Sequence, residues 1–145
     1  TQIIAKALSV SLAEAEKLKI KYGLIVDSKS SKSQSNIFDA LVPSLVDLVQ
    51  QIKKHLDYYQ SHSFHEHSPS KDKGIFKIML CGGGANLKGF PEFLSEQLKI
   101  KVELGNPWAN ILSDNKKEIV QLSPGESLRY TAALGLALRG IKENI

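Results

Sequence analysis

The sequence predicts an α/β fold in which a buried strand leads through a glycine turn into a helix. The apolar run Ile78–Cys81 is typical of a strand, the triple glycine Gly82–Gly84 follows it, and Pro91–Leu98 has a helical pattern. Glycine tolerates positive φ and lets another group approach the main chain closely. Ligands in open α/β sheets lie just outside the carboxyl ends of strands. A tight strand-to-helix turn without a ligand fits the same residues, and both interpretations stay open here.

Two short helices are expected before this turn. The stretch Gln2–Leu8 has a helical pattern from the start of the chain. Ser11 and Glu14 have the spacing of a capping box, and Gly23 is well placed to end the helix that they begin. The polar stretch Asp27–Asn36, rich in Ser and Lys, indicates a loop or a hairpin tip.

A longer helix with one apolar stripe comes next. Pro43 belongs in a first turn, which places the start of the regular helix near Val42. A polar linker, Ser61–Gly74, follows it. The stripe consists of residues at three- and four-residue steps, namely Leu41, Leu45, Leu48, Val49, Ile52, Leu56 and Tyr59.

The remaining elements follow the glycine turn. Pro91 lies in the first turn of its amphipathic helix, and Lys101–Leu104 alternates as a strand does. Ser123–Glu126 opens a last helix whose small and apolar residues predict that it is buried between neighbours. Cys81, in the apolar strand, is expected to be a small core residue.

The composition excludes several classes of function. The chain has 145 residues, 42% of them hydrophobic and 23% charged, which is typical of one globular domain. Its net charge of +4 comes from Lys residues spread along the chain, so we expect no nucleic-acid partner. No apolar run approaches the roughly 18–20 residues that span a bilayer, so we expect no direct membrane insertion. The single cysteine fits a reducing cytoplasm.

Four histidines lie close together, in and just before the polar linker. They are His55, His62, His65 and His67. Zinc sites use clustered histidines, but they also need firm geometry and usually Cys or carboxylate partners, which a Ser- and Lys-rich linker offers little of. We therefore interpret them as solvated histidines and predict no metal site.

Three segments, taken in order, resemble one family. They are Glu14–Lys19 with Tyr22–Gly23, then Leu80–Gly89, then Asn106–Trp108 followed by Ser123–Pro124 and Leu134–Arg139. Together they resemble the carboxy-terminal lobe of the actin-like ATPases, and within them the PilM-type inner-membrane platform proteins of type IV pili. The resemblance covers essentially the whole chain. It implies a ribonuclease-H-like, actin-like ATPase lobe with an incomplete sheet and flanking helices, in which residues 1–36 form a helical or hairpin insert and residues 37–145 the core.

The resemblance also implies an ATP site in a cleft between two lobes, with Mg²⁺ in the intact protein. Six residues fall on the family's pattern: Gly82 and Gly83 where the backbone approaches the nucleotide, Gly84 and Asn86 beside the adenine, and Glu16 and Lys19 near the ribose or the base edge. Residues three apart on a helix project to the same side, so Glu16 and Lys19 make local sense as a pair. An ordinary exposed helix pair would have the same spacing.

In this family the phosphate hairpins and the magnesium carboxylates mostly come from sequence upstream of Thr1, and the opening without Met suggests a piece of a longer protein. Phosphoryl transfer depends on positioning and on charge neutralisation by metal and cationic groups. We therefore expect no catalytic residue in this chain and no ATP hydrolysis by it alone. The first strands of the family's sheet also lie upstream, and the open edge that they would leave invites self-association.

The function that this resemblance implies is a cytoplasmic scaffold at the inner membrane. Its partners would be the cytoplasmic tails of inner-membrane pilus assembly proteins, which would hold it peripherally at that membrane. Two alternatives remain: an FtsA-type cell-division protein, and a sugar or acid kinase of the same superfamily. FtsA-type proteins usually end in an amphipathic membrane-targeting helix after a linker, whereas this sequence stops at Lys142–Ile145, directly after the last predicted helix. That disfavours the first alternative unless the sequence was cut there too. The Glu14–Lys19 segment is closer to the cytoskeletal branch than to the kinases.

Overall fold

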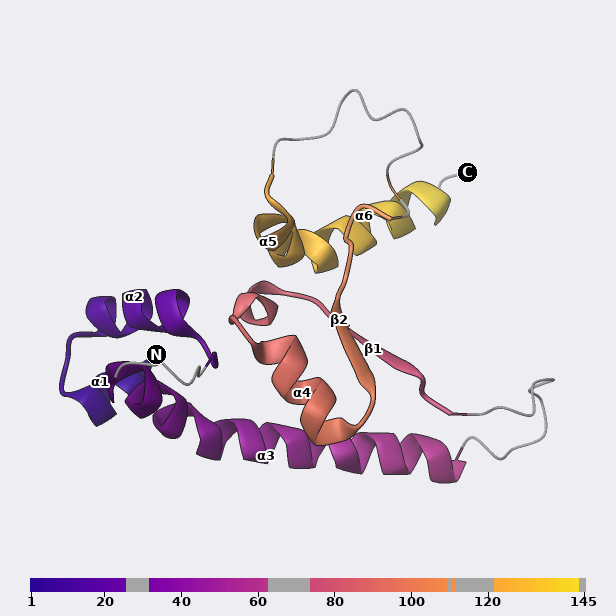
Figure 1. The fold of residues 1–145 in the computed structure, drawn as a ribbon. Helices are drawn as coiled ribbons and strands as arrows, with labels where there is room; N and C mark the ends of the chain where they lie inside the picture. The colour runs from indigo at the N-terminus through magenta and orange to yellow at the C-terminus, as the bar shows by residue number, and fades with distance from the viewer. Residues whose placement is uncertain (26–31, 63–73, 110, 112–121, 144–145) are drawn as a thin grey trace. The chain divides into compact units, whose positions relative to one another are not determined.

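The computed structural model describes residues 1–25, 32–62, 74–109, 111 and 122–143 (Figure 1). Two short strands, β1 (Lys77–Leu80) and β2 (Lys101–Leu104), pair as a two-stranded sheet. The described chain is therefore mixed α/β with a small sheet, which confirms the predicted class at that level. The helices are α1 (Gln2–Leu8), α2 (Leu12–Tyr22), α3 (Lys32–His62), α4 (Phe90–Leu98), α5 (Pro124–Ser127) and α6 (Thr131–Glu143), with 3₁₀ turns η1 (Gly83–Asn86) and η3 (Leu128–Tyr130).

Contacts divide the chain into two compact units. Unit 1 comprises Thr1–Ile78 and Leu87–Val102, and unit 2 comprises Met79–Asn86 and Glu103–Ile145. The first two residues of each strand belong to unit 1 and the last two to unit 2, so the boundary passes through both strands. The division after residue 36 stays a prediction, although α3 runs across that position.

The core of unit 1 is formed by α1, α2 and α3. Ser11 caps α2 as predicted, since its hydroxyl oxygen accepts the Glu14 backbone N–H at 3.2 Å. α2 ends at Gly23 with φ +59°, so the predicted end of the helix is also confirmed. Burial of apolar side chains from all three helices supplies the main stabilisation. The buried set is Ile4, Ala15, Leu24, Ile37, Leu41 and Leu45.

The long helix begins ten residues earlier than Pro43 indicates, and the predicted loop at residues 32–36 is helical. α3 starts at Lys32 and contains Pro43 in its interior. An interior proline lacks its N–H and clashes with the preceding turn, at a cost of about 3 kcal/mol. Ile37 is completely buried and Leu41 nearly so, and burying such side chains stabilises by about 1.5–3 kcal/mol each. The predicted start near Val42 was therefore wrong, because burial of Ile37 and Leu41 offsets the cost of the interior proline.

The end of α2 is joined closely to the loop that precedes α4. The Leu24 backbone N–H donates to the Lys88 carbonyl oxygen at 2.8 Å, and the Lys88 ammonium donates to the Lys21 carbonyl oxygen at 3.0 Å. A Cβ on Gly23 would lie 2.5 Å from the same Lys88 oxygen. Glycine is therefore required here both by the positive φ and by the close approach.

The strands β1 and β2 run parallel. The Gly105 N–H, just after β2, donates to the Leu80 carbonyl oxygen at the end of β1 at 2.8 Å, so the carboxyl ends of the two strands lie together. The predicted bounds Lys101–Leu104 are confirmed. The expected burial of β1 was wrong, because Met79 is 56% exposed and Cys81 is exposed too. Side chains alternate between the two faces of a sheet, and in the described residues β1 has neighbours on too few sides to bury them.

The last helical segment of unit 2 begins as predicted. Ser123 and Glu126 form a complete capping box at the start of α5. Leu128 in η3 is 2% exposed, but α6 is largely exposed, with Leu136 at 70% and Ile141 at 59%. The expected burial of this helix between neighbours is therefore not found in the described part of the chain, where α6 lacks packing partners for its apolar side chains.

Replacing Gly23 with alanine tests the junction between α2 and the loop before α4. We expect Gly23→Ala to lower the free energy of unfolding by about 2 kcal/mol, because the methyl group meets the Lys88 carbonyl and the backbone conformation is strained. Urea denaturation followed by circular dichroism measures this. Gly135→Ala is the matched control, since it lies in α6 with nothing within 4 Å of its Cβ position and should stabilise by about 0.5–1 kcal/mol. Equal stability of Gly23→Ala and the parent chain would contradict this account.

Candidate functional site

The glycine turn lies at the carboxyl end of β1, in unit 2, and a helical segment far along the chain fixes its backbone. Gly82 has φ +88°, a conformation that favours glycine. Its N–H donates to the Leu128 carbonyl oxygen at 3.0 Å, and its own carbonyl oxygen accepts the Ala85 N–H at 3.2 Å. Ala85 is buried. The predicted strand, turn and helix therefore occur in that order, and the turn has a defined conformation.

Two glycines of the turn have open space beside them. A Cβ placed on Gly82 or on Gly84 would meet no atom within 4 Å in the described structure. Packing inside the protein therefore does not explain why these positions lack side chains. For Gly82 the positive φ is a sufficient reason, but no such φ constrains Gly84. The backbone of the turn is accessible to a flat or charged group.

Asn86, at the end of the turn, is held by α5. Its side-chain amide donates to the Gly125 carbonyl oxygen at 2.7 Å. A Cβ on Gly125 would lie 3.0 Å from the Asn86 Oδ1, so the two segments approach closely. Asn86 is exposed. Its predicted place beside an adenine ring stays a prediction, and the structure gives it a second role in fixing the turn.

Arg129, which no sequence motif singles out, lies against the turn. Its Cγ is 3.5 Å from the Cβ position of Gly83. The guanidinium forms no ion pair within 4 Å among the described residues. Arg129 follows Leu128 directly, so the bond from Gly82 to the Leu128 carbonyl places it. The sequence contains no signal for the position of Arg129, because the hydrogen bond between Gly82 and Leu128 joins segments more than forty residues apart.

Glu16 and Lys19 form an ion pair on α2, in unit 1. The Lys19 Nζ lies 2.8 Å from the Glu16 Oε2, which confirms that the two side chains project to the same side of the helix. The Thr1 hydroxyl donates to the same carboxylate, and Lys19 also donates to the Thr1 hydroxyl oxygen at 3.2 Å. These bonds favour the charged carboxylate, so hydrogen bonds from Lys19 and then Thr1 lower the pKa of Glu16.

The six predicted residues thus fall into two groups. The structure brings Gly82, Gly83, Gly84 and Asn86 together in the turn of unit 2, and it brings Glu16 and Lys19 together in unit 1. The expectation that all six border one nucleotide stays a prediction.

Of the four clustered histidines, His65 and His67 lie outside the described residues. His62 stacks on Tyr58 with ring centroids 4.0 Å apart. The described residues contain no group of three or more His, Cys, Asp or Glu side chains that could hold a metal ion. In the same residues no helix combines the length and the apolar character that a bilayer span requires.

The fold and the turn define a mixed α/β protein with an accessible glycine turn after its first strand. The sequence model of the family described as type IV pilus assembly protein PilM matches residues 1–141, and the chain belongs to this family. A solved structure described as a PilM-PilN type IV pilus biogenesis complex is similar, with a TM-score of 0.66 and 29% sequence identity. The similarity covers 97% of this chain and 35% of that chain, so this chain spans about a third of that length. The comparison with curated proteins gives no match.

Neutralising Glu16 tests the cluster of Thr1, Glu16 and Lys19. The pair is partly exposed, so we expect Glu16→Gln to lower the free energy of unfolding at neutral pH by at most ~1 kcal/mol. Because folding lowers the pKa of Glu16, this stabilisation is present above the ordinary pKa of a Glu carboxyl and is lost as the pH falls through the pKa of the folded protein.

Urea denaturation at neutral pH and at acidic pH measures the difference between variant and parent, which should shrink on acidification. Glu14→Gln is the control, since it removes a charge from the same helix without contacting Thr1 or Lys19. An equal loss of stability in both variants, or a loss that does not depend on pH, would contradict the assignment.

Proposed function

We infer that this chain supplies the base and ribose side of an ATP site in a cytoplasmic, actin-like scaffold of the type IV pilus machinery. The observation that carries the proposal is the open space beside Gly82 and Gly84, at the carboxyl end of a parallel strand. That is where α/β proteins bind ligands. Membership of the PilM family supports the assignment to pilus assembly.

The residues of the turn suit the base and ribose of a nucleotide. The uncovered backbone of Gly82 and Gly84 would accept the face of an adenine ring, because no side chain separates it from the ligand. The Arg129 guanidinium, beside Gly83, would stack on the base or attract a phosphate, since a planar cation favours both contacts. Glu16 and Lys19 would hydrogen-bond ribose hydroxyls or the base edge in the intact protein, in exchange for their bonds to Thr1 and to each other.

Nucleotide binding by this chain would support a scaffolding role more than catalysis of phosphoryl transfer. Phosphoryl transfer needs metal and cationic groups around the phosphates, and the turn and the Glu16–Lys19 pair supply only one guanidinium and one ammonium. We propose that ATP, with Mg²⁺ bound elsewhere in the intact protein, stiffens the scaffold. Its partners would be cytoplasmic tails of inner-membrane pilus proteins, a proposal supported by the similarity to a PilM-PilN complex. Self-association through an edge of the two-stranded sheet is a further part of the proposal.

Filling the open space at Gly84 tests nucleotide binding directly. Gly84→Val should fold normally, because nothing lies within 4 Å of its Cβ position and its φ is not positive. We expect it to weaken adenosine and ATP binding at least about tenfold, a change of about 1.4 kcal/mol, because the side chain occupies the ligand's place. Isothermal titration calorimetry with adenosine and with magnesium ATP measures the affinities.

A second variant separates the parts of the ligand. Arg129→Gln should weaken ATP binding more than adenosine binding if the guanidinium attracts a phosphate, and both equally if it stacks on the base. Gly135→Ala, in α6 with nothing within 4 Å of its Cβ position, is the control for both experiments. Unchanged affinity in a folded Gly84→Val protein would show that the turn is only structural.

A further inference from the structure

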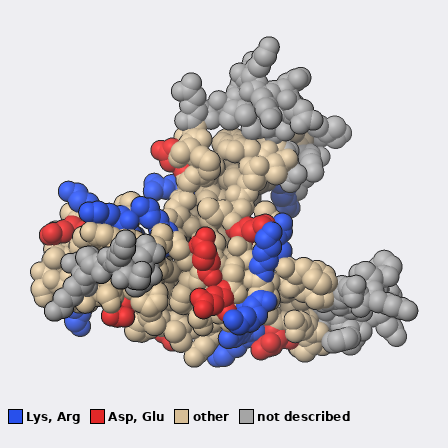
Figure 2. Space-filling view, in the orientation of Figure 1, with Lys and Arg blue, Asp and Glu red and all other residues tan. Residues whose placement is uncertain are grey.

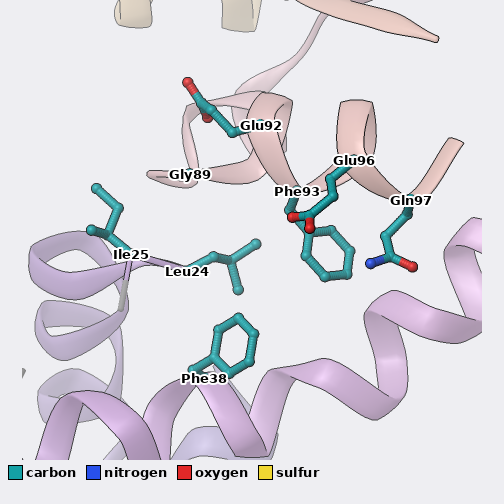
Figure 3. Close-up of a pocket in the computed structure, with 8 residues that line it drawn as sticks. All are labelled: Leu24, Ile25, Phe38, Gly89, Glu92, Phe93, Glu96 and Gln97. Atoms are coloured by element: carbon teal, nitrogen blue, oxygen red, sulfur yellow. The ribbon is translucent and has the colours of Figure 1, made fainter. Parts of the chain in front are cut away.

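A groove in unit 1 is lined by none of the residues that we assign to the glycine turn or to the Glu16–Lys19 pair. It is formed where the end of α2, the first turns of α3 and the outer face of α4 meet (Figure 3). Its volume is about 670 Å³, within the roughly 300–1,000 Å³ that is typical of ligand pockets. The lining residues are Leu24, Ile25, Phe38, Gly89, Glu92, Phe93, Glu96 and Gln97.

The floor of the groove is apolar. Figure 3 shows the side chains of Leu24, from the turn after α2, Phe38, from α3, and Phe93, from α4, lining the groove together. Phe38 and Phe93 pack against the core of unit 1 and are only partly buried, so each ring keeps one side open to the groove. Ile25 is 42% exposed at one end. An apolar side chain placed here would remove these surfaces from water, which is favourable.

The rim of the groove is acidic. Glu92 and Glu96 are exposed on α4, four residues apart, and therefore lie on the same side of the helix. Figure 2 shows acidic side chains over α4 in the centre of the view. Neither carboxylate forms an ion pair among the described residues. Among the described residues that line the groove, these two carboxylates are the only charged groups.

We propose that this groove binds a basic, amphipathic segment of a partner protein. One bulky apolar side chain of the segment fills the space between Leu24, Phe38 and Phe93, and Lys or Arg residues beside it pair with Glu92 and Glu96. Charge complementarity selects this occupant, because opposite potentials across an interface favour the right partner and repel others. The acidic rim repels an anionic lipid surface and a nucleotide phosphate alike.

Two synthetic peptides test the proposal on the complete chain. The first carries a leucine and a phenylalanine flanked by lysines, and the second is identical except that glutamates replace the lysines. We expect the basic peptide to shift backbone amide resonances at Gly89–Gln97 and near Leu24 and Phe38, and the acidic peptide to leave them unchanged. Binding of the basic peptide should weaken as salt is added.

Charge variants supply the decisive comparison. Glu92→Gln with Glu96→Gln should weaken binding of the basic peptide about fivefold to tenfold, as expected for two exposed ion pairs. Glu14→Gln with Asp47→Asn removes two exposed carboxylates that do not line the groove, and it should bind like the parent chain.

Any one of three results with the peptides would overturn the proposal. They are equal binding of the two peptides, parent-like affinity of the Glu92→Gln, Glu96→Gln variant, and shifts confined to residues outside the groove. Sedimentation of the chain without peptide provides a further test. A dimer that the Glu92→Gln, Glu96→Gln variant abolishes would overturn the assignment to a partner protein, because a second copy would then be the occupant. The experiment involves no nucleotide, so its outcome is independent of the ATP proposal.

Discussion

The candidate site depends on a pair of hydrogen bonds that join the glycine turn to the segment around α5. The Gly82 N–H is bound by the Leu128 carbonyl, and the Asn86 amide binds the Gly125 carbonyl. A glycine-rich loop is entropically costly to hold in one conformation, since glycine has more backbone freedom to lose than any other residue. These bonds fix both ends of the turn, leave its glycines open to solvent and place Arg129 beside it. A preformed turn avoids an ordering cost when a ligand binds.

The two units use different means to present a surface. In unit 1, helices α1, α2 and α3 form an apolar core, and the Gly23–Lys88 contact joins α4's leading loop to the end of α2. The acidic groove is the exposed margin of that core. Among the described residues of unit 2, Leu128 is the main buried large side chain, and the turn is held by specific hydrogen bonds. The recognition that we propose for unit 1 would therefore depend on shape and charge, and the one that we propose for unit 2 would depend on access to the backbone.

Local signals in the sequence predicted much of the fold. The caps at Ser11 and Ser123 and the breaker Gly23 act within a few residues, so the starts of α2 and α5 and the end of α2 were predicted correctly. The predicted last helix is instead divided into α5, η3 and α6. Predictions that depended on distant packing failed: α3 extends through Pro43 because Ile37 is buried against other helices, and Cys81 is exposed because β1 has few neighbours. The turn was predicted because its glycines follow one another in the sequence. The position of Arg129 and the groove were not predicted, because tertiary contacts alone create them.

The central claim is that the glycine turn is a ligand site and not only a strand-to-helix connection. The most direct test is a backbone amide NMR titration of the chain with adenosine, which reports where a ligand binds. Our account predicts shifts concentrated at Gly82–Asn86 and at Arg129, with further shifts near Glu16 and Lys19 when the same titration is made on a longer, intact protein. An intact protein that binds adenosine while Gly82–Asn86 remain unperturbed, or that does not bind it at millimolar concentration, would contradict the account.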